Sequence, residues 1–318
     1  MPPMDLEPQV RAEGLLRPDR PVIVLLSGGR DSVCLLDLAV RIAGTGAVSA
    51  LHVNYGLRDS AADDEQFCHE LCERLGVALT LHRPQRPEGN LQAWARDQRY
   101  TQAARLALDR GAEVAAGHTA TDQVETVLYR LAASPGRRAL LGMRPRDGRL
   151  VRPLLGVWRE EVTAHCGERR LDWREDPSNE SADYARNRTR HGLVAELRRL
   201  HPAAEENVLR TVELLRDEAA VLEAAVAVVL DEAGDPPVVA RLAALPPALA
   251  RLAVQELADR AGGGRAPAVG HRTEEILALG ATGALDVGGG LRALIRDGRL
   301  SFVPTPPRRG SRSEAVPA

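Results

Sequence analysis

Residues 21–32 read PVIVLLSGGRDS, and the fold class follows from this stretch. Pro21 to Leu26 is a short, unbroken apolar run, which is the pattern of a strand buried on both faces of a sheet. Ser27 to Ser32 is a polar turn, and apolar residues then recur at helical spacing from Val33 to Ala43. A buried strand that leads through a glycine turn into a helix indicates an α/β protein.

The alternation of strand and helix continues through the first half of the chain. We expect strands at 47–53, 77–82 and 113–116, with 150–155 as a fifth, and helices at 59–75, 90–110 and 122–133. Strands separated by helices form a parallel sheet with right-handed crossovers. The predicted fold is therefore α/β, a parallel sheet with helices on both faces, followed by a helical domain and a small C-terminal α+β segment.

The second half of the chain has a different pattern. Apolar residues recur at 4-3-4-3 spacing along one helical stripe, at Val208, Val212, Leu215, Ala219, Leu222, Val226 and Val229. A partner helix at 247–260 favours an intramolecular hairpin over a dimeric coiled coil, and a homodimer stays open. Further on, 291–295 and 300–303 flank Asp297-Gly298, a pair typical of type I′ β-hairpin turns.

These patterns divide the 318 residues into five segments. We expect an N-terminal extension at 1–19, a catalytic domain at 20–185, a helical domain at 186–262, a small segment with a β-hairpin at 263–304 and a disordered tail at 305–318. More than one domain is expected because one hydrophobic core seldom organises a chain of this length. The tail is rich in Pro, Arg and Ser, a composition that buries little apolar surface.

The composition excludes several classes of protein. The chain contains no lysine, so all 42 of its Lys+Arg residues are arginine. This excludes a Walker A loop, a kinase strand lysine and a cofactor held as a lysine Schiff base. Any lysine in the chemistry of this protein must therefore arrive as a substrate.

Several further patterns bear on the compartment. The longest apolar run, Ala224 to Leu230, is far shorter than a membrane helix needs. The N-terminus lacks the pattern of a secretory signal, and the four cysteines have no zinc-site spacing. We therefore expect a cytoplasmic protein with reduced thiols and no membrane partner.

The turn at 27–32 is suited to binding phosphates. Gly28 and Gly29 let the backbone approach an anion closely, and the helix that follows presents N–H groups at its N-terminus. Ser27 and Ser32 add hydroxyl donors, and Asp31 is placed to hold Mg²⁺ against phosphates. The predicted nucleotide-binding residues are Ser27, Gly28, Gly29, Arg30, Asp31 and Ser32.

A second polar group follows the strand predicted at 113–116. Asp122 and Glu125, three residues apart, share a helix face separate from the apolar one, and His118 lies just before that helix. Parallel sheets bind ligands at the carboxyl ends of their strands, where these side chains lie. They are candidate catalytic residues. The alternative is an acidic helix start that favours the helix dipole, beside a histidine that caps a turn.

Several stretches, taken in order, resemble known families. SGGRDS at 27–32 is similar to the signature of the PP-loop ATP pyrophosphatase superfamily. Other segments resemble the tRNA-isoleucine lysidine synthases: HVNYGLR at 52–58, GNL, AR and RY between 89 and 100, GHTATDQVET at 117–126, RPLL at 152–155, EDPSN at 175–179 and RNRTR at 186–190. Tyr55 and Gln92 stand where that family usually has His and Glu. The resemblance runs from Val22 to Arg190 and fits the shorter form of the family.

The resemblance implies a two-step reaction. ATP would adenylate the C2 oxygen of the wobble cytidine in the CAU anticodon of tRNA(Ile), releasing pyrophosphate, and free L-lysine would then displace AMP to leave lysidine. The loop at 27–32 and Mg²⁺ would bind the pyrophosphate. Asp31, Asp122 and Glu125 would orient and deprotonate the lysine, with His118 positioning the intermediate. Which carboxylate holds the metal and which the lysine stays open.

Arginines are the candidate RNA contacts, since the net charge is only −2. Seven of them lie from Arg130 to Arg152, and Arg186, Arg188 and Arg190 form a second cluster. Arg96 and Arg99 would meet the lysine carboxylate or the RNA, and a solvated surface is the alternative for all of these residues. The low aromatic content, 3%, argues against an extended base-stacking platform.

Two other functions stay open. Another PP-loop tRNA-modifying enzyme, such as a thiolase, would use a catalytic cysteine or a C-x-x-C pair. Cys34 follows the loop, whereas Cys68 and Cys72 are four residues apart on a helix, where packing accounts for them. A non-catalytic ATP- or RNA-binding protein would not need Asp31, Asp122 and Glu125.

Overall fold

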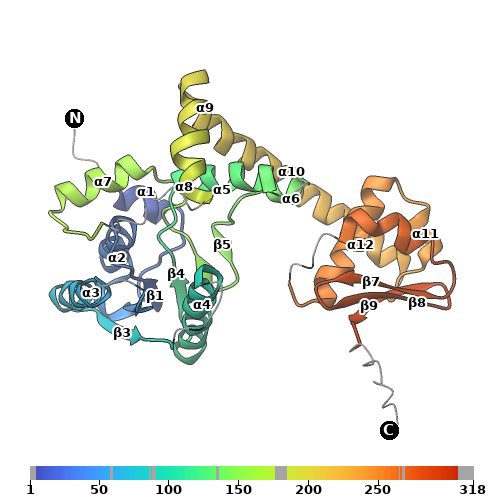
Figure 1. Cartoon of the computed structure of the whole chain (residues 1–318), viewed down its shortest axis with the longest axis horizontal. Coiled ribbons are helices and arrows are strands. Elements are labelled where there is room, and N and C mark those ends of the chain that lie inside the picture. The colour runs from blue at the N-terminus through green and yellow to red at the C-terminus, as the bar shows by residue number, and fades with distance from the viewer. Residues whose placement is uncertain are drawn as a thin grey trace, which may run out of the picture. The chain divides into compact units, whose positions relative to one another are not determined.

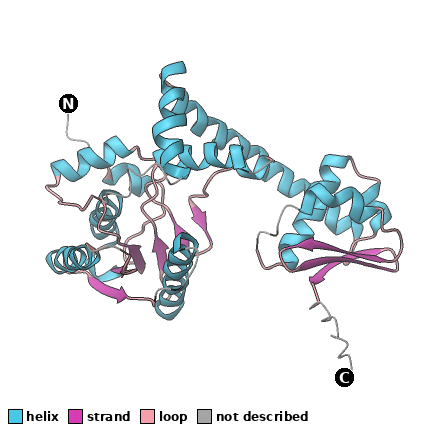
Figure 2. Cartoon of the chain, in the orientation of Figure 1, coloured by secondary structure: helices cyan, strands magenta, loops and turns pink. Residues whose placement is uncertain are grey.

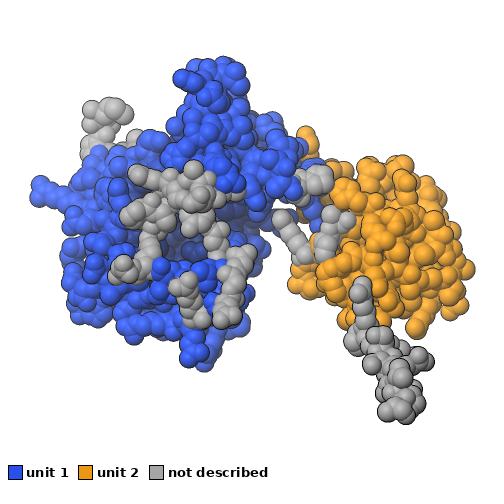
Figure 3. Space-filling model, in the orientation of Figure 1, with its two compact units in different colours: residues 1–215 blue, residues 216–318 orange. Residues whose placement is uncertain are grey.

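The computed structural model describes residues 5–57, 60–85, 87, 91–133, 136–175, 185–264, 266 and 269–306. The chain forms two compact units, residues 1–215 and 216–318 (Figure 3). Strands alternate with helices in the first unit, and helices precede a three-stranded sheet in the second (Figures 1 and 2). Among the described residues, no helix combines the length and the apolar character that crossing a membrane requires.

The first unit is built on a six-stranded sheet of order β3-β2-β1-β4-β6-β5. All neighbouring strands in it run parallel except β5, which pairs antiparallel with β6 at the edge. The strands are β1 (Val22–Leu25), β2 (Val48–Val53), β3 (Ala78–His82), β4 (Glu113–Ala115), β5 (Arg146–Asp147) and β6 (Leu150–Val151). The predicted α/β fold with a parallel sheet is confirmed.

Helices connect these strands and continue beyond the sheet. The first are α1 (Glu7–Ala12), α2 (Arg30–Ala43), α3 (Ala61–Leu75), α4 (Leu91–Arg110), α5 (Ala120–Ala133), α6 (Arg137–Leu140) and α7 (Arg159–Glu168), with the 3-10 turn η1 (Thr45–Ala47). Next come α8 (Ala185–Arg188), the π-helix η3 (Thr189–Val194), α9 (Ala195–Leu200) and α10 (Ala204–Ala233). Helix α10 contains the boundary between the two units.

Alternate side chains of β1 enter two different cores. Val22 and Val24 join the core that contains α2, α3 and α7, whereas Ile23 and Leu25 join the core that contains α4. Figure 1 shows α2 and α3 on one side of β1 and α4 on the other. Because successive side chains of a strand point to opposite faces, a strand covered on both faces needs an unbroken apolar run.

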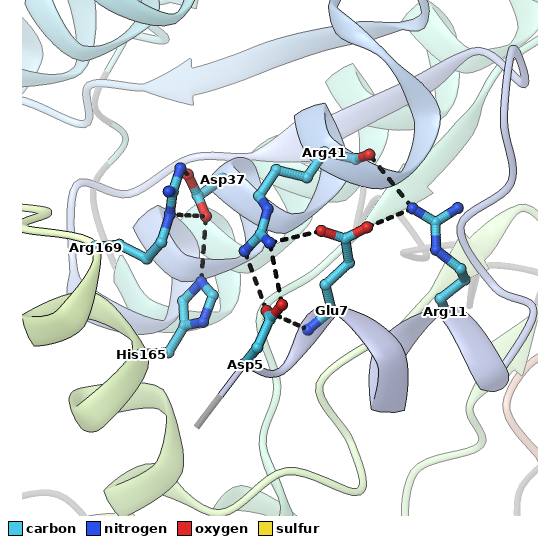
Figure 4. A network of polar contacts seen from close by, with 7 residues as sticks. All are labelled: Asp5, Glu7, Arg11, Asp37, Arg41, His165 and Arg169. Carbon is cyan, nitrogen blue, oxygen red and sulfur yellow. Dashed lines mark hydrogen bonds and ion pairs between the residues drawn. The ribbon is translucent and has the colours of Figure 1, made fainter. Parts of the chain in front are cut away.

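The N-terminal segment packs onto the first unit. Leu6 and Val10 are buried in the same core as α2. Asp5 and Glu7 both pair with Arg41, whose guanidinium lies 3.2 Å from Asp5 and 2.7 Å from Glu7 (Figure 4). The segment is therefore held by apolar burial, with charge pairs at its edge.

A polar network lies buried between α2 and α7 (Figure 4). The carboxylate of Asp37 accepts hydrogen bonds from His165 Nε2 at 3.1 Å and from Arg169 at 3.1 and 3.3 Å. Burial alone would raise the pKa of Asp37, but the bonds from His165 and Arg169 outweigh it, so this pKa lies below its ordinary value. The network fixes α7 against α2.

The second unit packs helices on an antiparallel sheet of order β7-β8-β9. Its elements are α11 (Val239–Ala243), α12 (Pro247–Ala261), η4 (Val269–Arg272), α13 (Thr273–Leu277), β7 (Gly283–Gly288), β8 (Leu291–Arg296) and β9 (Arg299–Pro304). The predicted hairpin is confirmed: Arg296 pairs with Arg299, and Asp297 and Gly298 have φ of 49° and 70°. Two consecutive positive φ angles are the requirement of a type I′ turn.

The predicted helical stripe is the buried side of α10. Val212, Ala219 and Val226 are buried, and the other stripe residues are half-buried. At its C-terminal end, Val226 and Leu230 share a core with Ala253 and Val254 of α12. The helix predicted at 247–260 therefore packs within the same chain.

The structure differs from the predictions at several element boundaries. Helix α2 already begins at Arg30, because the Gly29 carbonyl accepts the N–H groups of Ser32 and Val33. The strand predicted at 150–155 ends at Val151, before Pro153, which has no N–H to donate. The two-residue β5 and the glycine-bounded β7 were not predicted.

The predicted domain boundaries stay predictions. The observed units divide between Leu215 and Arg216. The predicted tail lies outside the described residues from 307 onward.

We expect Asp37→Ala to lower the free energy of unfolding by about 1–3 kcal/mol, because the buried His165 loses its acceptor. Urea unfolding at pH 7 measures this. Asp5→Ala is the matched control, since it removes a half-exposed partner of Arg41 and should cost less than about 1 kcal/mol. Equal losses in the two variants would contradict the role given to the buried network.

Candidate active site

A cleft of about 540 Å³ lies in the first unit at the carboxyl ends of β1, β2 and β4. Leu26 and Ser27 line it after β1, Tyr55 after β2, and Gly117 and His118 after β4. The rest of the lining comes from helices α2, α3, α4, α5, α7, α8 and η3 and from residues 173–175. This edge of a parallel sheet is where ligands bind.

The loop between β1 and α2 is held in shape by its own hydrogen bonds. The hydroxyls of Ser27 and Ser32 lie 3.1 Å apart, and Ser32 Oγ donates to the Gly29 carbonyl at 2.8 Å. Gly29 is the N-cap of α2 and brings no side chain that competes for the first-turn N–H groups. The N–H groups of Ser32 and Val33 already donate to the Gly29 carbonyl, so the first-turn N–H groups left for an anion are those of Arg30 and Asp31.

Two glycines allow the backbone to pack closely around this loop. Gly28 has a φ of 85°, and a Cβ there would lie 3.3 Å from Cys68 Sγ. A Cβ on Gly117 would lie only 2.9 Å from the carbonyl oxygen of Asp31. Gly117 thus packs backbone against backbone on the first turn of α2, which joins the loops that follow β1 and β4.

Asp31 lies in an environment that disfavours its charge. Burial and the nearby carboxylate of Asp122 raise the pKa of Asp31 above its ordinary value, although Arg30 and Arg159 oppose this. Its Oδ1 lies 3.2 Å from Arg30 Nε. A carboxylate in this position is stabilised by a bound cation.

Asp122 uses its two oxygens differently. Its Oδ2 accepts the N–H of Thr119 at 2.9 Å, which caps α5 and orients the side chain. Its Oδ1 lies 3.5 Å from Arg159 and 3.8 Å from Arg190. The predicted alternative, an acidic residue that only stabilises the start of a helix, therefore accounts for Oδ2 but not for Oδ1.

Glu125 is 1% exposed and accepts two hydrogen bonds from Arg190, at 2.5 and 3.2 Å. Of this pair, only Arg190 reaches the described lining of the cleft. A fork-like guanidinium held by both carboxylate oxygens has a fixed orientation. Glu125 thus acts on the cleft through Arg190.

The structure brings most of the predicted site residues together. Those that line the cleft are Ser27, Gly29, Arg30, Asp31, Ser32, Arg99, His118, Asp122 and Arg190. Gly28 shapes the loop and Glu125 binds Arg190. Arg96 and Arg188 are exposed and outside the described lining, and the side chain of Arg186 lies outside the described residues.

The predicted arginine cluster from 130 to 152 contains residues of two kinds. Arg152 is buried and donates to the Arg144 carbonyl at 2.6 Å, so it supports the fold. Arg144, Arg146 and Arg149 are exposed. The prediction of contacts with RNA phosphates therefore applies to these three exposed arginines.

Sequence reasoning missed several residues of the cleft. Roles were not predicted for Tyr55, Asp64, Tyr100, Arg159, Trp173, Arg174, Glu175, Asn187 and His191, all of which line it. Arg174 donates its N–H to the Gly28 carbonyl at 2.9 Å, and its guanidinium lies 3.2 Å from Asp64. The sequence did contain a signal for four of these residues, since the segments that resemble the family include Tyr55, Tyr100, Glu175 and Asn187. It contained none for Arg174 and Asp64, which are far apart in the chain and come together only in the folded structure.

A π-helix brings two side chains into the cleft. Arg190 and His191 are consecutive in η3, and both line the cleft. Single π turns inside helices occur frequently at functional sites. Sequence periodicity of 3.6 residues does not reveal such a turn, so the position of His191 was not predictable.

The donor set of the cleft fits a magnesium ion that also binds phosphates. No three His, Cys, Asp or Glu side chains cluster as metal ligands in the described part of the chain. Mg²⁺ in phosphate sites takes one or two carboxylates from the protein, however. Asp31, whose pKa is raised by burial and by the nearby carboxylate of Asp122, fits that role.

A parallel sheet whose first strand leads through SGGRDS into a helix defines a PP-loop protein, and a model of the PP-loop domain matches residues 5–197. The fold is similar to that of the U34-tRNA thiolase NcsA from Methanococcus maripaludis, with a TM-score of 0.56 at 20% identity over 66% of this chain and 77% of that one. Within the PP-loop class, the chain is 35% identical to the tRNA(Ile)-lysidine synthase of Symbiobacterium thermophilum over 99% of this chain and 72% of the relative. It belongs to the tRNA(Ile)-lysidine synthase family, which confirms the resemblance seen in its motifs.

Other curated relatives match about two thirds of this chain. The tRNA(Ile)-lysidine synthase of Solibacter usitatus is 41% identical over 63% of this chain and 46% of its own length. That of Thermus thermophilus is 40% identical over 66% of this chain and 43% of its own length. The chain thus spans less than half the length of these two relatives.

We expect Gly117→Ala to lower the free energy of unfolding by about 1–3 kcal/mol, because the added methyl overpacks against the backbone of Asp31. Gly156→Ala is the control, since nothing lies within 4 Å of a Cβ at that position. Its effect should stay within about 0.5 kcal/mol. Urea unfolding compares the two, and equal stability of both variants would contradict the close packing at Gly117.

We expect Asp31→Asn to leave the melting temperature unchanged or raised at pH 7.5. A carboxyl whose pKa is raised in the folded state destabilises that state as the pH rises from the unfolded value through the folded one. The gain from Asp31→Asn should therefore be larger at pH 7.5 than at pH 4.5, in thermal unfolding followed by circular dichroism. The exposed Asp147, changed to Asn, serves as the control, and a clear loss of stability at pH 7.5 in Asp31→Asn would be the contrary result.

Proposed function

We propose that this chain is a cytoplasmic enzyme that joins L-lysine to C2 of the wobble cytidine of tRNA(Ile) with a CAU anticodon, using ATP and Mg²⁺. The observation that carries the proposal is a single cleft shared by the 27–32 loop, Asp122 and Arg190. The loop suits a leaving pyrophosphate, and the carboxylate and arginine suit the charged ends of an amino acid. The named function of its tRNA(Ile)-lysidine synthase relatives supports the proposal.

In the first step, the C2 oxygen of cytidine attacks the α-phosphorus of ATP, and pyrophosphate leaves. The backbone N–H groups of Arg30 and Asp31 and the hydroxyls of Ser27 and Ser32 stabilise the charge that develops on the pyrophosphate. Mg²⁺ would neutralise phosphate charge when bound, and Asp31 is the residue that would hold it. His118, at the end of β4, would position the adenylated nucleotide.

In the second step, the lysine amine attacks C2, AMP leaves with the C2 oxygen, and the attacking nitrogen gives up a proton. A lysine ammonium normally has a pKa of about 10.4, so the amine needs help to lose its proton. Asp122 Oδ1 would orient the amine and accept that proton. Arg190, held by Glu125, would bind an anion, either the lysine carboxylate or the AMP phosphate.

The positions of the cysteines favour ligation over thiolation. All four cysteines are buried, and none is part of the described lining of the cleft. Burial raises the pKa of Cys68 to about 12 and that of Cys72 to about 11. Cys68 and Cys72 are therefore poor nucleophiles and poor metal ligands. The pKa of Cys34, which follows the loop, is also raised, by its hydrogen bond with Cys166 and by burial.

The test is a reconstituted reaction with MgATP, labelled L-lysine and unmodified tRNA(Ile), followed by mass spectrometry of the nucleosides. We expect lysidine only when all components are present. Asp122→Asn should lower the rate by roughly 100-fold or more, because it removes the group that accepts the proton. Asp147→Asn, an exposed carboxylate from the same unit, should react like the wild type.

Two results would reject this proposal. One is ATP-dependent modification of a different kind, such as incorporation of sulfur. The other is the absence of ATP turnover with any tRNA, which would leave a binding protein. Unchanged activity in Asp122→Asn would reject the role of that residue while leaving the reaction in place.

A further inference from the structure

Aromatic residues are scarce in this chain, and several of them meet at the cleft. The sequence has only two Phe, three Trp and four Tyr. Tyr55, at the end of β2, and Tyr100, on α4, line the cleft, and Trp94 on α4 packs edge-on against Tyr55. We call Tyr55, Trp94 and Tyr100 the aromatic corner.

The rings of the aromatic corner have fixed neighbours. The centroids of Tyr55 and Trp94 lie 5.8 Å apart with an interplanar angle of 67°. Both tyrosines pack against the core that contains Ile23, Leu51 and Ala103. The corner is thus supported by the core while Tyr55 and Tyr100 remain part of the cleft wall.

Guanidinium groups gather on the same corner. The Cζ atoms of Arg96 and Arg99 lie 4.9 and 5.5 Å from the centroid of the Tyr100 ring. Within the part of the chain that the structure describes, Arg99 Nε is buried and has no hydrogen-bond partner. A buried donor without an acceptor is costly, so a ligand that supplies an acceptor here would bind more tightly.

We propose that the aromatic corner, with Arg96 and Arg99, receives an unstacked base of the RNA substrate. Proteins that act on single-stranded RNA stack its bases on aromatic rings and on arginine planes, and they bind its phosphates with the same arginines. The alternative planar ligand is the adenine of ATP. The guanidinium groups of Arg96 and Arg99, which lie over the Tyr100 ring, favour an RNA base, because they offer planes for stacking and charges for the phosphates that flank each base on both sides.

This inference rests on the proposed function, and it deepens it by naming where the wobble cytosine binds. The low aromatic content had argued against an extended stacking platform. That prediction concerns an extended platform, whereas one extruded base needs only one or two rings.

The test compares two anticodon stem-loop RNAs, one with the wobble cytidine and one with an abasic wobble position. Dissociation constants are measured by fluorescence anisotropy for the wild type, Tyr100→Leu, Tyr100→Phe and Tyr129→Leu. We expect the wild type to prefer the cytidine RNA by about 10-fold or more. Tyr100→Leu should lose this preference while its affinity for the abasic RNA stays unchanged.

The other variants separate stacking from folding. Tyr100→Phe keeps the ring and should keep the preference. Tyr129→Leu changes a half-exposed tyrosine of α5 outside the described lining and should behave like the wild type. Unchanged affinity of Tyr100→Leu for the abasic RNA shows that the variant is folded.

Binding of MgATP, measured by displacement of a fluorescent ATP analogue, distinguishes the two sources of a base. Weaker MgATP binding in Tyr100→Leu, with the RNA preference retained, would overturn the inference and assign the corner to adenine. If Tyr100→Leu retains both its MgATP binding and its preference for the cytidine RNA, the inference is also overturned. The wild type is assayed for lysidine in parallel, so that loss of the stacking site and failure of the proposed reaction give different patterns.

Discussion

Contact between the backbone of Gly117 and the first turn of α2 determines the geometry of the cleft. A Cβ at Gly117 would lie 2.9 Å from the Asp31 carbonyl, so only glycine lets β4 end this close to the loop that follows β1. The two strands are neighbours in the sheet, and the helices that follow them, α2 and α5, carry Asp31 and Asp122 in their first turns. A contact between backbone atoms does not depend on side-chain rotamers. The backbone segments that carry the two carboxylates are therefore held near each other whether or not a ligand is present.

That proximity is unfavourable without a cation, and the surrounding arginines offset only part of it. Asp31 keeps a raised pKa although Arg30 and Arg159 lie nearby. The site thus presents charges of both signs. This suits the proposed binding of a metal and an ammonium by the carboxylates, and of phosphates by the loop and the arginines. Arginine suits these positions because it stays ionised even when burial lowers its pKa, as at Arg159. A chain without lysine also has no side-chain amine to compete with the substrate amine at an activated cytidine.

Composition and placement gave different information about RNA binding. The arginine-rich segment at 130–152 suggested one basic surface, yet Arg152 is buried and supports a loop. The scarce aromatics suggested little stacking, yet Tyr55 and Tyr100 both line the cleft, and Trp94 packs against Tyr55. A count of residue types cannot separate an arginine that binds a carbonyl from one that faces solvent, nor show that residues far apart in the chain share one wall.

The sequence by itself determined the parallel sheet, the loop at 27–32, the hairpin turn at Asp297-Gly298 and the family. These depend on local signals, namely an unbroken apolar run, glycines with special backbone angles and ordered motifs. Three features were decided only by the tertiary structure. Glu125 binds Arg190, and the backbone N–H of Arg174 donates to the Gly28 carbonyl. A π-helix brings His191 to the cleft. Each of these joins segments far apart in the chain or departs from regular helical spacing. Periodicity in the sequence reports which face of an element is buried, but it does not report which distant side chain lies opposite.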